Sequence, residues 1–244
     1  MKYVYKKSSL LTEATTHYCP GCGHGIIHNL VCEVIEELGI KDSTIAIAPV
    51  GCAVIAYDYW KLDTAEAAHG RPLAVASAMK RLRPDLTVFT YQGDGDLAAI
   101  GTAETVHAAN RGENLTVVFV NNGVYGMTGG QMAPTTLIKQ KTATSIKGRD
   151  LKLSGFPLKI SEMLALLEGT VYIERTSVHN PPSVIKTKKA IKKAFTNQLE
   201  GKGFSMVEVL SPCPTYWGLR PDEAMKRIDK DVIRQYPLGV LKDV

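Results

Sequence analysis

Four of the five cysteines in the chain lie in short segments that are rich in glycine or proline. These four are Cys19, Cys22, Cys52 and Cys213. Such turns can wrap backbone around a metal centre, and four thiolates suit either tetrahedral zinc or an iron–sulfur cluster. The fifth cysteine, Cys32, lies in an apolar, helix-like segment, where a free cysteine is commonly a small core residue. We therefore expect four thiol ligands and one packing residue.

The spacing of the four thiols bears on which metal centre they would hold. Cys19 and Cys22 form one local Cys-x-x-Cys pair, whereas Cys52 and Cys213 are distant single residues. Structural zinc sites usually gather two local pairs. The spacing therefore favours a cluster held between loops of a prebuilt fold, and it leaves zinc open. A redox dithiol at the Cys-x-x-Cys motif would leave the other two thiols unexplained.

Two polar motifs, GDG at 93–95 and NN at 121–122, each directly follow a predicted buried strand. Ligands of open parallel sheets bind at the carboxyl ends of the strands. The spacing from Asp94 to Asn122 (122 − 94 = 28 residues) leaves room for one helix and one returning strand. We therefore expect the two motifs to meet in space, although turns alone would favour the same residue types.

The residue types of these motifs suit a magnesium ion that shares its ligands with a diphosphate. Mg²⁺ prefers about six oxygen ligands. Asp94 supplies a carboxylate, Asn122 an amide oxygen and Val124 a backbone carbonyl. Glycines let the backbone approach phosphate closely, and hydroxyl groups add donors. The residues expected in these supporting roles are Gly93, Gly95 and Thr128.

The motifs are set among alternating helix-like and strand-like segments. Strands are predicted over 44–48, 86–91, 115–121, 170–175 and 204–210, and helices over 25–38, 71–82, 96–110, 160–168, 183–199 and 221–235. This alternation predicts an α/β fold with a doubly wound, mostly parallel sheet. Asp96 is expected to cap a helix. Residues 126–159 lack periodicity, and we expect an irregular loop over the site or against a partner.

Length and composition fit a globular protein with a sizeable core. The chain has 244 residues, of which 45% are hydrophobic and 22% charged, which excludes intrinsic disorder. We expect one domain over 1–244. The net charge of +5 is too mild for a typical nucleic-acid binder. We expect no membrane span and no signal peptide, because the apolar runs are too short, and hence a cytoplasmic protein.

The order of the motifs resembles a known family. GDG followed by NN at this spacing resembles the thiamine diphosphate motif. Together with CPGCGHG, PVGC, HGR and SPCPTYWG, it resembles the thiamine diphosphate-binding subunit of 2-oxoacid:ferredoxin oxidoreductases. The resemblance implies that family's fold, a magnesium ion on Asp94, Asn122 and Val124, and a [4Fe–4S] cluster on the four cysteines. It also implies that Gly51 and His69 lie beside the cofactor.

The resemblance implies an activity as well. The family converts a 2-oxo acid and coenzyme A to acyl-CoA, CO₂ and reduced ferredoxin, and the chain looks most like its branched-chain and 2-oxoglutarate members. No catalytic residue is assigned to this chain, because the family supplies the glutamate for the aminopyrimidine from a partner subunit. The resemblance therefore implies a hetero-oligomer. The alternative is a zinc-stabilised, non-catalytic scaffold with a diphosphate site. A non-oxidative thiamine decarboxylase would not need the four cysteines.

Overall fold

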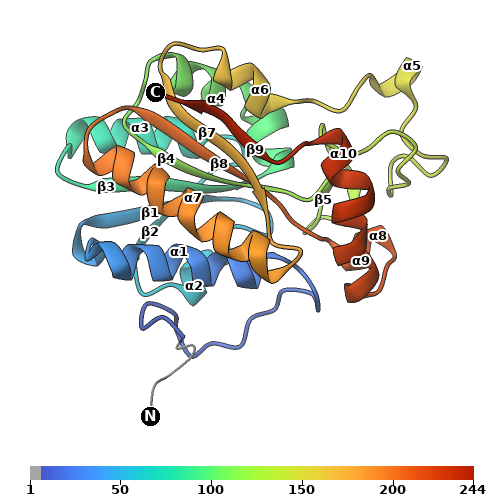
Figure 1. Ribbon diagram of the computed structural model, residues 1–244, viewed down its shortest axis with the longest axis horizontal. Coiled ribbons are helices and arrows are strands. Elements are labelled where there is room, and N and C mark those ends of the chain that lie inside the picture. The colour runs from blue at the N-terminus through green and yellow to red at the C-terminus, as the bar shows by residue number, and fades with distance from the viewer. Residues whose placement is uncertain (1–6) are drawn as a thin grey trace.

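A seven-stranded sheet runs through the centre of the computed structural model, which describes residues 7–244 (Figure 1). The strand order is β2-β1-β3-β4-β8-β7-β9, and only β9, at one edge, is antiparallel to its neighbour. The strands are β1 (Thr44–Pro49), β2 (Asp63–Ala67), β3 (Thr87–Gly93), β4 (Thr116–Asn121), β7 (Thr170–Ser177), β8 (Phe204–Leu210) and β9 (Gly239–Asp243). The predicted α/β class with a mostly parallel sheet is confirmed.

Helices cover both faces of this sheet. Two long helices, α1 (His24–Leu38) and α7 (Pro181–Leu199), pack on one face. On the other face lie α3 (Pro72–Leu82), α4 (Thr102–Asn110) and α6 (Ile160–Ala165) (Figure 1). Successive strand residues point to opposite faces, and because both faces are covered, the central strands β3, β4 and β8 are buried at nearly every position and mostly apolar. In β4, the side chains of Val118 and Val120 join the first core, and those of Val117 and Phe119 join the second.

Two edge strands were missed by the sequence pattern. Both β2 and β9 pair with a single neighbour, and several of their residues are exposed. Their sequences, DTAEA and GVLKD, therefore lack the continuous apolar run that marked the central strands. The predicted helix over 96–110 is also interrupted, because a π-helix at Asp96–Ile100 precedes α4.

The segment over 126–159 is more structured than predicted. Two short strands of two residues each, β5 (Val124–Tyr125) and β6 (Gln131–Met132), form an antiparallel hairpin, and a single helical turn, α5 (Leu151–Ser154), lies further on. The remaining short helices are η1 (Lys41–Ser43), α2 (Ala56–Tyr59), α8 (Pro214–Trp217), α9 (Pro221–Arg227), η3 (Ile228–Val232) and α10 (Ile233–Gln235). Among residues 7–244, every helix is too short or too polar to cross a bilayer.

Candidate cofactor and cluster site

The ends of β3 and β4 lie side by side, since Gly93 pairs with Val120 in the sheet. The GDG and NN motifs therefore meet at one edge of the sheet, as predicted. A cavity of about 60 Å³ lies between them. The residues predicted to bind the cofactor all line it, and these are Gly51, His69, Gly93, Asp94, Gly95, Asn122, Val124 and Thr128.

Asp94 is a buried carboxylate, only 2% exposed. Its Oδ2 accepts hydrogen bonds from the Gly123 N–H (2.7 Å) and the Thr135 hydroxyl (2.5 Å), and its Oδ1 accepts one from the Gly95 N–H (2.8 Å). Burial raises the pKa of Asp94 to about 6 despite these donors. Within residues 7–244 no lysine or arginine pairs with it, so the chain supplies donors without a positive charge. A buried carboxylate of this kind fits a divalent cation.

Asn122 and Val124 belong to a tight turn beside Asp94. The Asn122 Oδ1 accepts a hydrogen bond from the Val124 N–H at 3.0 Å. The Trp217 indole N–H donates to the Asn122 carbonyl, also at 3.0 Å. Trp217 therefore ties the segment after Cys213 to the turn that carries the predicted magnesium ligands. The SPCPTYWG motif contained this residue, but the sequence offered no sign of its partner.

Two glycines leave room beside the backbone in this cavity. A Cβ atom added to Gly93 or Gly51 would meet no other atom within 4 Å, and Gly51 adopts a φ of +117°. This open space fits the close approach of a phosphate to the backbone. Gly95 has a different role, because a Cβ there would lie 2.1 Å from the Tyr125 ring. Gly95 is therefore needed to pack Tyr125 rather than to make room for a phosphate.

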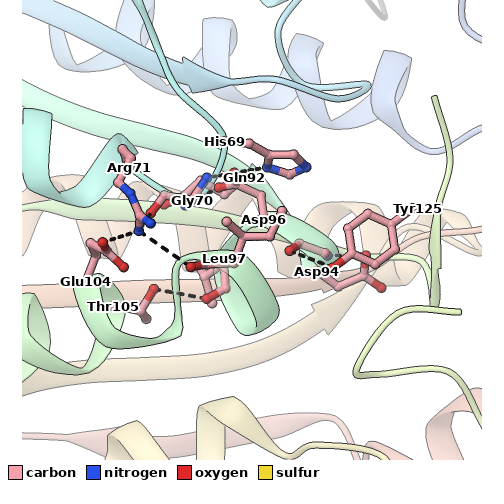
Figure 2. Close-up of polar contacts among 12 residues, drawn as sticks. His69, Gly70, Arg71, Gln92, Asp94, Asp96, Leu97, Glu104, Thr105 and Tyr125 are labelled. Atoms are coloured by element: carbon pink, nitrogen blue, oxygen red, sulfur yellow. Dashed lines mark hydrogen bonds and ion pairs between the residues drawn. The ribbon is translucent and has the colours of Figure 1, made fainter. Parts of the chain in front are cut away.

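Figure 2 shows that Asp96 is surrounded by donors from three directions. Its Oδ1 contacts His69 Nδ1 and the Gly70 N–H, each at 2.5 Å, and its Oδ2 accepts from Gln92 Nε2 at 2.5 Å. The prediction that Asp96 caps a helix is wrong, since its carboxylate turns toward His69 and the helix has no side-chain cap. The Asp96 carboxylate instead fixes the orientation of His69 at the cavity wall.

Two threonines lie at the site, of which the sequence singled out only Thr128. The Thr128 hydroxyl donates to Gln131 Oε1 at 2.7 Å, although Thr128 does line the cavity. Thr135, which the sequence did not single out, lies 41 positions from Asp94 and donates to it directly. Its place depends on how the segment after β6 folds back, which residue types alone do not reveal.

The four predicted cysteine ligands line a second cavity, of about 220 Å³. The Cys22 N–H donates to the Cys19 carbonyl at 2.9 Å, which closes the Cys-x-x-Cys turn. Burial raises the pKa of the Cys22 and Cys213 thiols to about 12. Burial therefore disfavours the thiolate form at these positions, and a positively charged metal centre would stabilise it. Cys32 is fully buried in the core, as predicted.

The size of this cavity helps to distinguish a single zinc ion from an iron–sulfur cluster as its occupant. In the described part of the chain, no three His, Cys, Asp or Glu side chains are gathered closely enough to hold a single metal ion. A space of about 220 Å³ among four thiols fits a group of several atoms. The two cavities also share part of their walls. The shared residues are His24, Cys52, Asn122, Gly126 and Met127.

An aromatic cluster supports the wall between the two cavities. The Tyr18 ring stacks on His24 at 4.8 Å, and the Tyr18 hydroxyl donates to the Cys52 carbonyl at 2.9 Å. His24 Nδ1 lies 2.6 Å from the Tyr91 hydroxyl. Burial lowers the pKa of His24 to about 4, so this imidazole is neutral at physiological pH.

Comparisons with known proteins agree with this geometry. Residues 49–209 match the family described as thiamine pyrophosphate enzyme, C-terminal TPP binding domain. The chain is 48% identical over 240 residues to the ketoisovalerate oxidoreductase subunit VorA of Methanothermobacter marburgensis, a match covering 98% of this chain and 50% of VorA. It is 39% identical over 203 residues to the 2-oxoglutarate synthase subunit KorB of Methanocaldococcus jannaschii, covering 82% of this chain and 70% of KorB.

A solved structure shares the same fold. The 2-oxoglutarate:ferredoxin oxidoreductase from Magnetococcus marinus superimposes with a TM-score of 0.79 at 27% identity, covering 99% of this chain and 86% of that chain. The chain spans about half the length of the VorA relatives. It therefore belongs to the thiamine pyrophosphate enzyme family, among the subunits of 2-oxoacid:ferredoxin oxidoreductases.

Proposed function

We propose that this chain carries both thiamine diphosphate and a [4Fe–4S] cluster within a 2-oxoacid:ferredoxin oxidoreductase. The observation that carries the proposal is the shared wall of the two cavities. One cavity holds the buried carboxylate and the open glycines, the other holds four cysteines, and Cys52 and Asn122 line both. A cofactor that releases electrons and a centre that accepts them would then be neighbours.

In this proposal the first cavity binds the diphosphate end of the cofactor. Asp94, Asn122 and the Val124 carbonyl hold Mg²⁺, which neutralises the diphosphate charge. The backbone at Gly93 and Gly51 lies along the phosphates, where a Cβ would have open space. Asp96 fixes the imidazole of His69 at the cavity wall. When bound, thiamine diphosphate serves as the electron sink for decarboxylation of a 2-oxo acid.

The second cavity binds the cluster through Cys19, Cys22, Cys52 and Cys213. Burial raises the pKa of three of these thiols, Cys22, Cys52 and Cys213, so a positively charged centre would be needed to bind them as thiolates. The Tyr18 hydroxyl holds the Cys52 carbonyl and so fixes the loop that joins both cavities. Neutral His24 separates the two cavities without adding a charge between them.

The overall reaction needs partner subunits. A 2-oxo acid anion, coenzyme A and two oxidised ferredoxins give acyl-CoA, CO₂, two reduced ferredoxins and one proton. No glutamate of the described chain lines the cofactor cavity. We therefore assign the glutamate for the aminopyrimidine to a partner subunit, with this chain acting as one domain of a cytoplasmic hetero-oligomer. The relatives named for ketoisovalerate share more residues with this chain than those named for 2-oxoglutarate, which favours a branched-chain 2-oxo acid.

Anaerobic co-expression with the other subunits tests this function. The purified complex should be brown, contain iron and thiamine diphosphate, and reduce a viologen dye with ketoisovalerate and coenzyme A. Asp94→Asn should lose thiamine diphosphate and dye reduction, whereas Asp85→Asn, in an exposed ion pair with Arg83, should keep both. A colourless complex that contains zinc would support the scaffold alternative instead. Tight thiamine diphosphate binding by Asp94→Asn would refute the magnesium ligands.

A further inference from the structure

The segment 138–156, which we call the docking arm, extends from the body beside α8–α10 (Figure 1). It exposes large apolar side chains that have no cover within the described chain. Leu153 is 89% exposed, Ile146 78% and Phe156 75%. Ile138 and Leu151 are exposed as well. Scattered single apolar residues are normal on a protein surface, but five within 19 positions indicate an interaction site.

One residue of the docking arm, Arg149, holds the arm in shape through hydrogen bonds to the backbone of the arm and of the segment before it. The Arg149 guanidinium is buried and donates to carbonyls on both sides of the arm base. The acceptors are the carbonyls of Ala133, Pro134, Thr136, Ser154, Gly155 and Phe156, at 2.8–3.3 Å. Lys139 adopts a φ of +64°, a costly conformation for a residue with a side chain. A shape fixed in advance reduces the entropy lost on binding.

The docking arm is also strongly basic. None of its four lysines has a carboxylate partner within residues 7–244, and these are Lys139, Lys141, Lys147 and Lys152. Its one acid, Asp150, is used locally, because its carboxylate accepts the backbone N–H groups of Lys152 and Leu153. An acidic surface that contains an apolar groove would complement these features. Its carboxylates would pair with the lysines, and its groove would bury the exposed apolar side chains.

A series of hydrogen bonds connects the base of the docking arm to the cofactor cavity. The Arg149 guanidinium donates to the Thr136 carbonyl, and the Thr136 hydroxyl donates to the Gly123 carbonyl at 2.6 Å. The Gly123 N–H in turn donates to Asp94. Two residues of the cavity wall, Val50 and Met127, are themselves large, apolar and exposed. A protein that covered this wall would lie next to the arm.

We propose that the docking arm binds an acidic, apolar-grooved surface on another subunit of the same oxidoreductase. This inference rests on the proposed function, in which a partner completes the cofactor cavity. The VorA relatives match this chain over only half their length, so their remaining half offers a polypeptide of suitable size for the partner. The arm's link to the Asp94 loop favours this partner over a second copy of the chain or a membrane surface.

Paired surface substitutions test the proposal in the co-expressed complex. The arm variant carries Leu153→Asp and Phe156→Asp, and the control carries Leu82→Asp and Leu166→Asp, at residues 81% and 84% exposed outside the arm. With an affinity tag on the other subunit, co-purification and native mass spectrometry measure association. The arm variant should bind at least about tenfold more weakly, as expected for apolar anchors, and the control should bind as wild type does. Lys147→Glu with Lys152→Glu should also weaken binding, less so at high salt.

Three outcomes would overturn the proposal. The arm variant could assemble with wild-type affinity. It could retain the partner and lose only self-association, which would make the arm a contact between copies. Wild-type complex could bind anionic phosphatidylserine vesicles through the arm while the arm variant still assembled, which would identify a membrane surface. Iron and thiamine diphosphate contents are measured separately, so an arm-dependent complex without either cofactor would refute the proposed function and leave the arm's role intact.

Discussion

Replacing Arg149 with methionine should loosen the docking arm without unfolding the sheet. The guanidinium donates to six backbone carbonyls, and those of Ala133 and Thr136 are in buried surroundings. Methionine is unbranched but has no donor, so the Thr136 carbonyl would lose its partner, whereas the Ala133 carbonyl would keep the Thr136 N–H at 3.2 Å. Each buried unsatisfied group costs about 1–3 kcal/mol. The four remaining carbonyls are only partly buried and can bind water, so the total should be about 1–3 kcal/mol.

Limited proteolysis with trypsin measures this loss directly. The docking arm carries four exposed lysines, and cleavage at each requires the arm to open. When opening is fast compared with cleavage, the cleavage rate follows the open population. Even about 1 kcal/mol should therefore raise cleavage within 138–156 about fivefold in Arg149→Met. Fragment masses identify the cleaved bonds.

The control is Arg83→Met, because Arg83 forms an exposed ion pair with Asp85, and exposed pairs of this kind contribute little to stability. Its cleavage pattern within the docking arm should match that of the wild type. Equal cleavage of Arg149→Met and wild type would mean that the six hydrogen bonds do not hold the arm. A general loss of stability, with cleavage spread across the sheet, would refute the view that Arg149 acts locally.

Three further predictions concern the site and its support. Thr135→Val should weaken Mg²⁺-dependent thiamine diphosphate binding about 5–30-fold by calorimetry, and Thr135→Ser should restore it, because Ser keeps the donor to Asp94. The predicted cluster ligands are Cys19, Cys22, Cys52 and Cys213. Replacing any one of them with serine should lower iron content and visible absorbance, whereas Cys32→Ser should lower stability alone. Glu208→Gln should cost about 3 kcal/mol in urea unfolding, because it leaves buried Arg175 with one carboxylate partner instead of two.

Local rules of sheet structure predicted where Asp94 and Asn122 lie, whereas Gly51 and His69 were expected only from the family resemblance. Buried strands are mostly apolar and can be recognised, and residues directly after them must lie at the carboxyl edge of the sheet. This rule alone brought Asp94 and Asn122 together, and the cavity between them includes every residue predicted for the cofactor. The cysteines were recognisable because Gly and Pro surround them, whereas Cys32 stood in a helical apolar pattern.

The residues that were missed depend on long-range folding. Thr135 reaches Asp94, and Trp217 reaches Asn122, across 41 and 95 positions of the chain. Neither residue type marks such a contact, since threonines and tryptophans occur in many other places. Asp96 was assigned to a cap because acids favour helix starts. Its carboxylate binds His69 instead, because the turn before α3 lies next to it once the sheet has formed.

Buried charge explains why the cofactor edge of the sheet can be rigid before any cofactor binds. Glu208 in β8 accepts hydrogen bonds from Asn121 (2.7 Å) and Arg175 (2.7 Å), so the residue next to Asn122 is fixed from the core side. The Tyr236 ring lies over Arg175, and its hydroxyl donates to the Thr135 carbonyl at 3.0 Å, so the residue that holds Asp94 is fixed from the same network. Asp94 and Asn122, two of the three predicted magnesium ligands, thus depend on one buried ion pair. The buried ion pair of Arg175 and Glu208 thus supports the cavity from the core side, while Asp94 has no positively charged partner among residues 7–244. A buried carboxylate in this condition gains most from binding a cation.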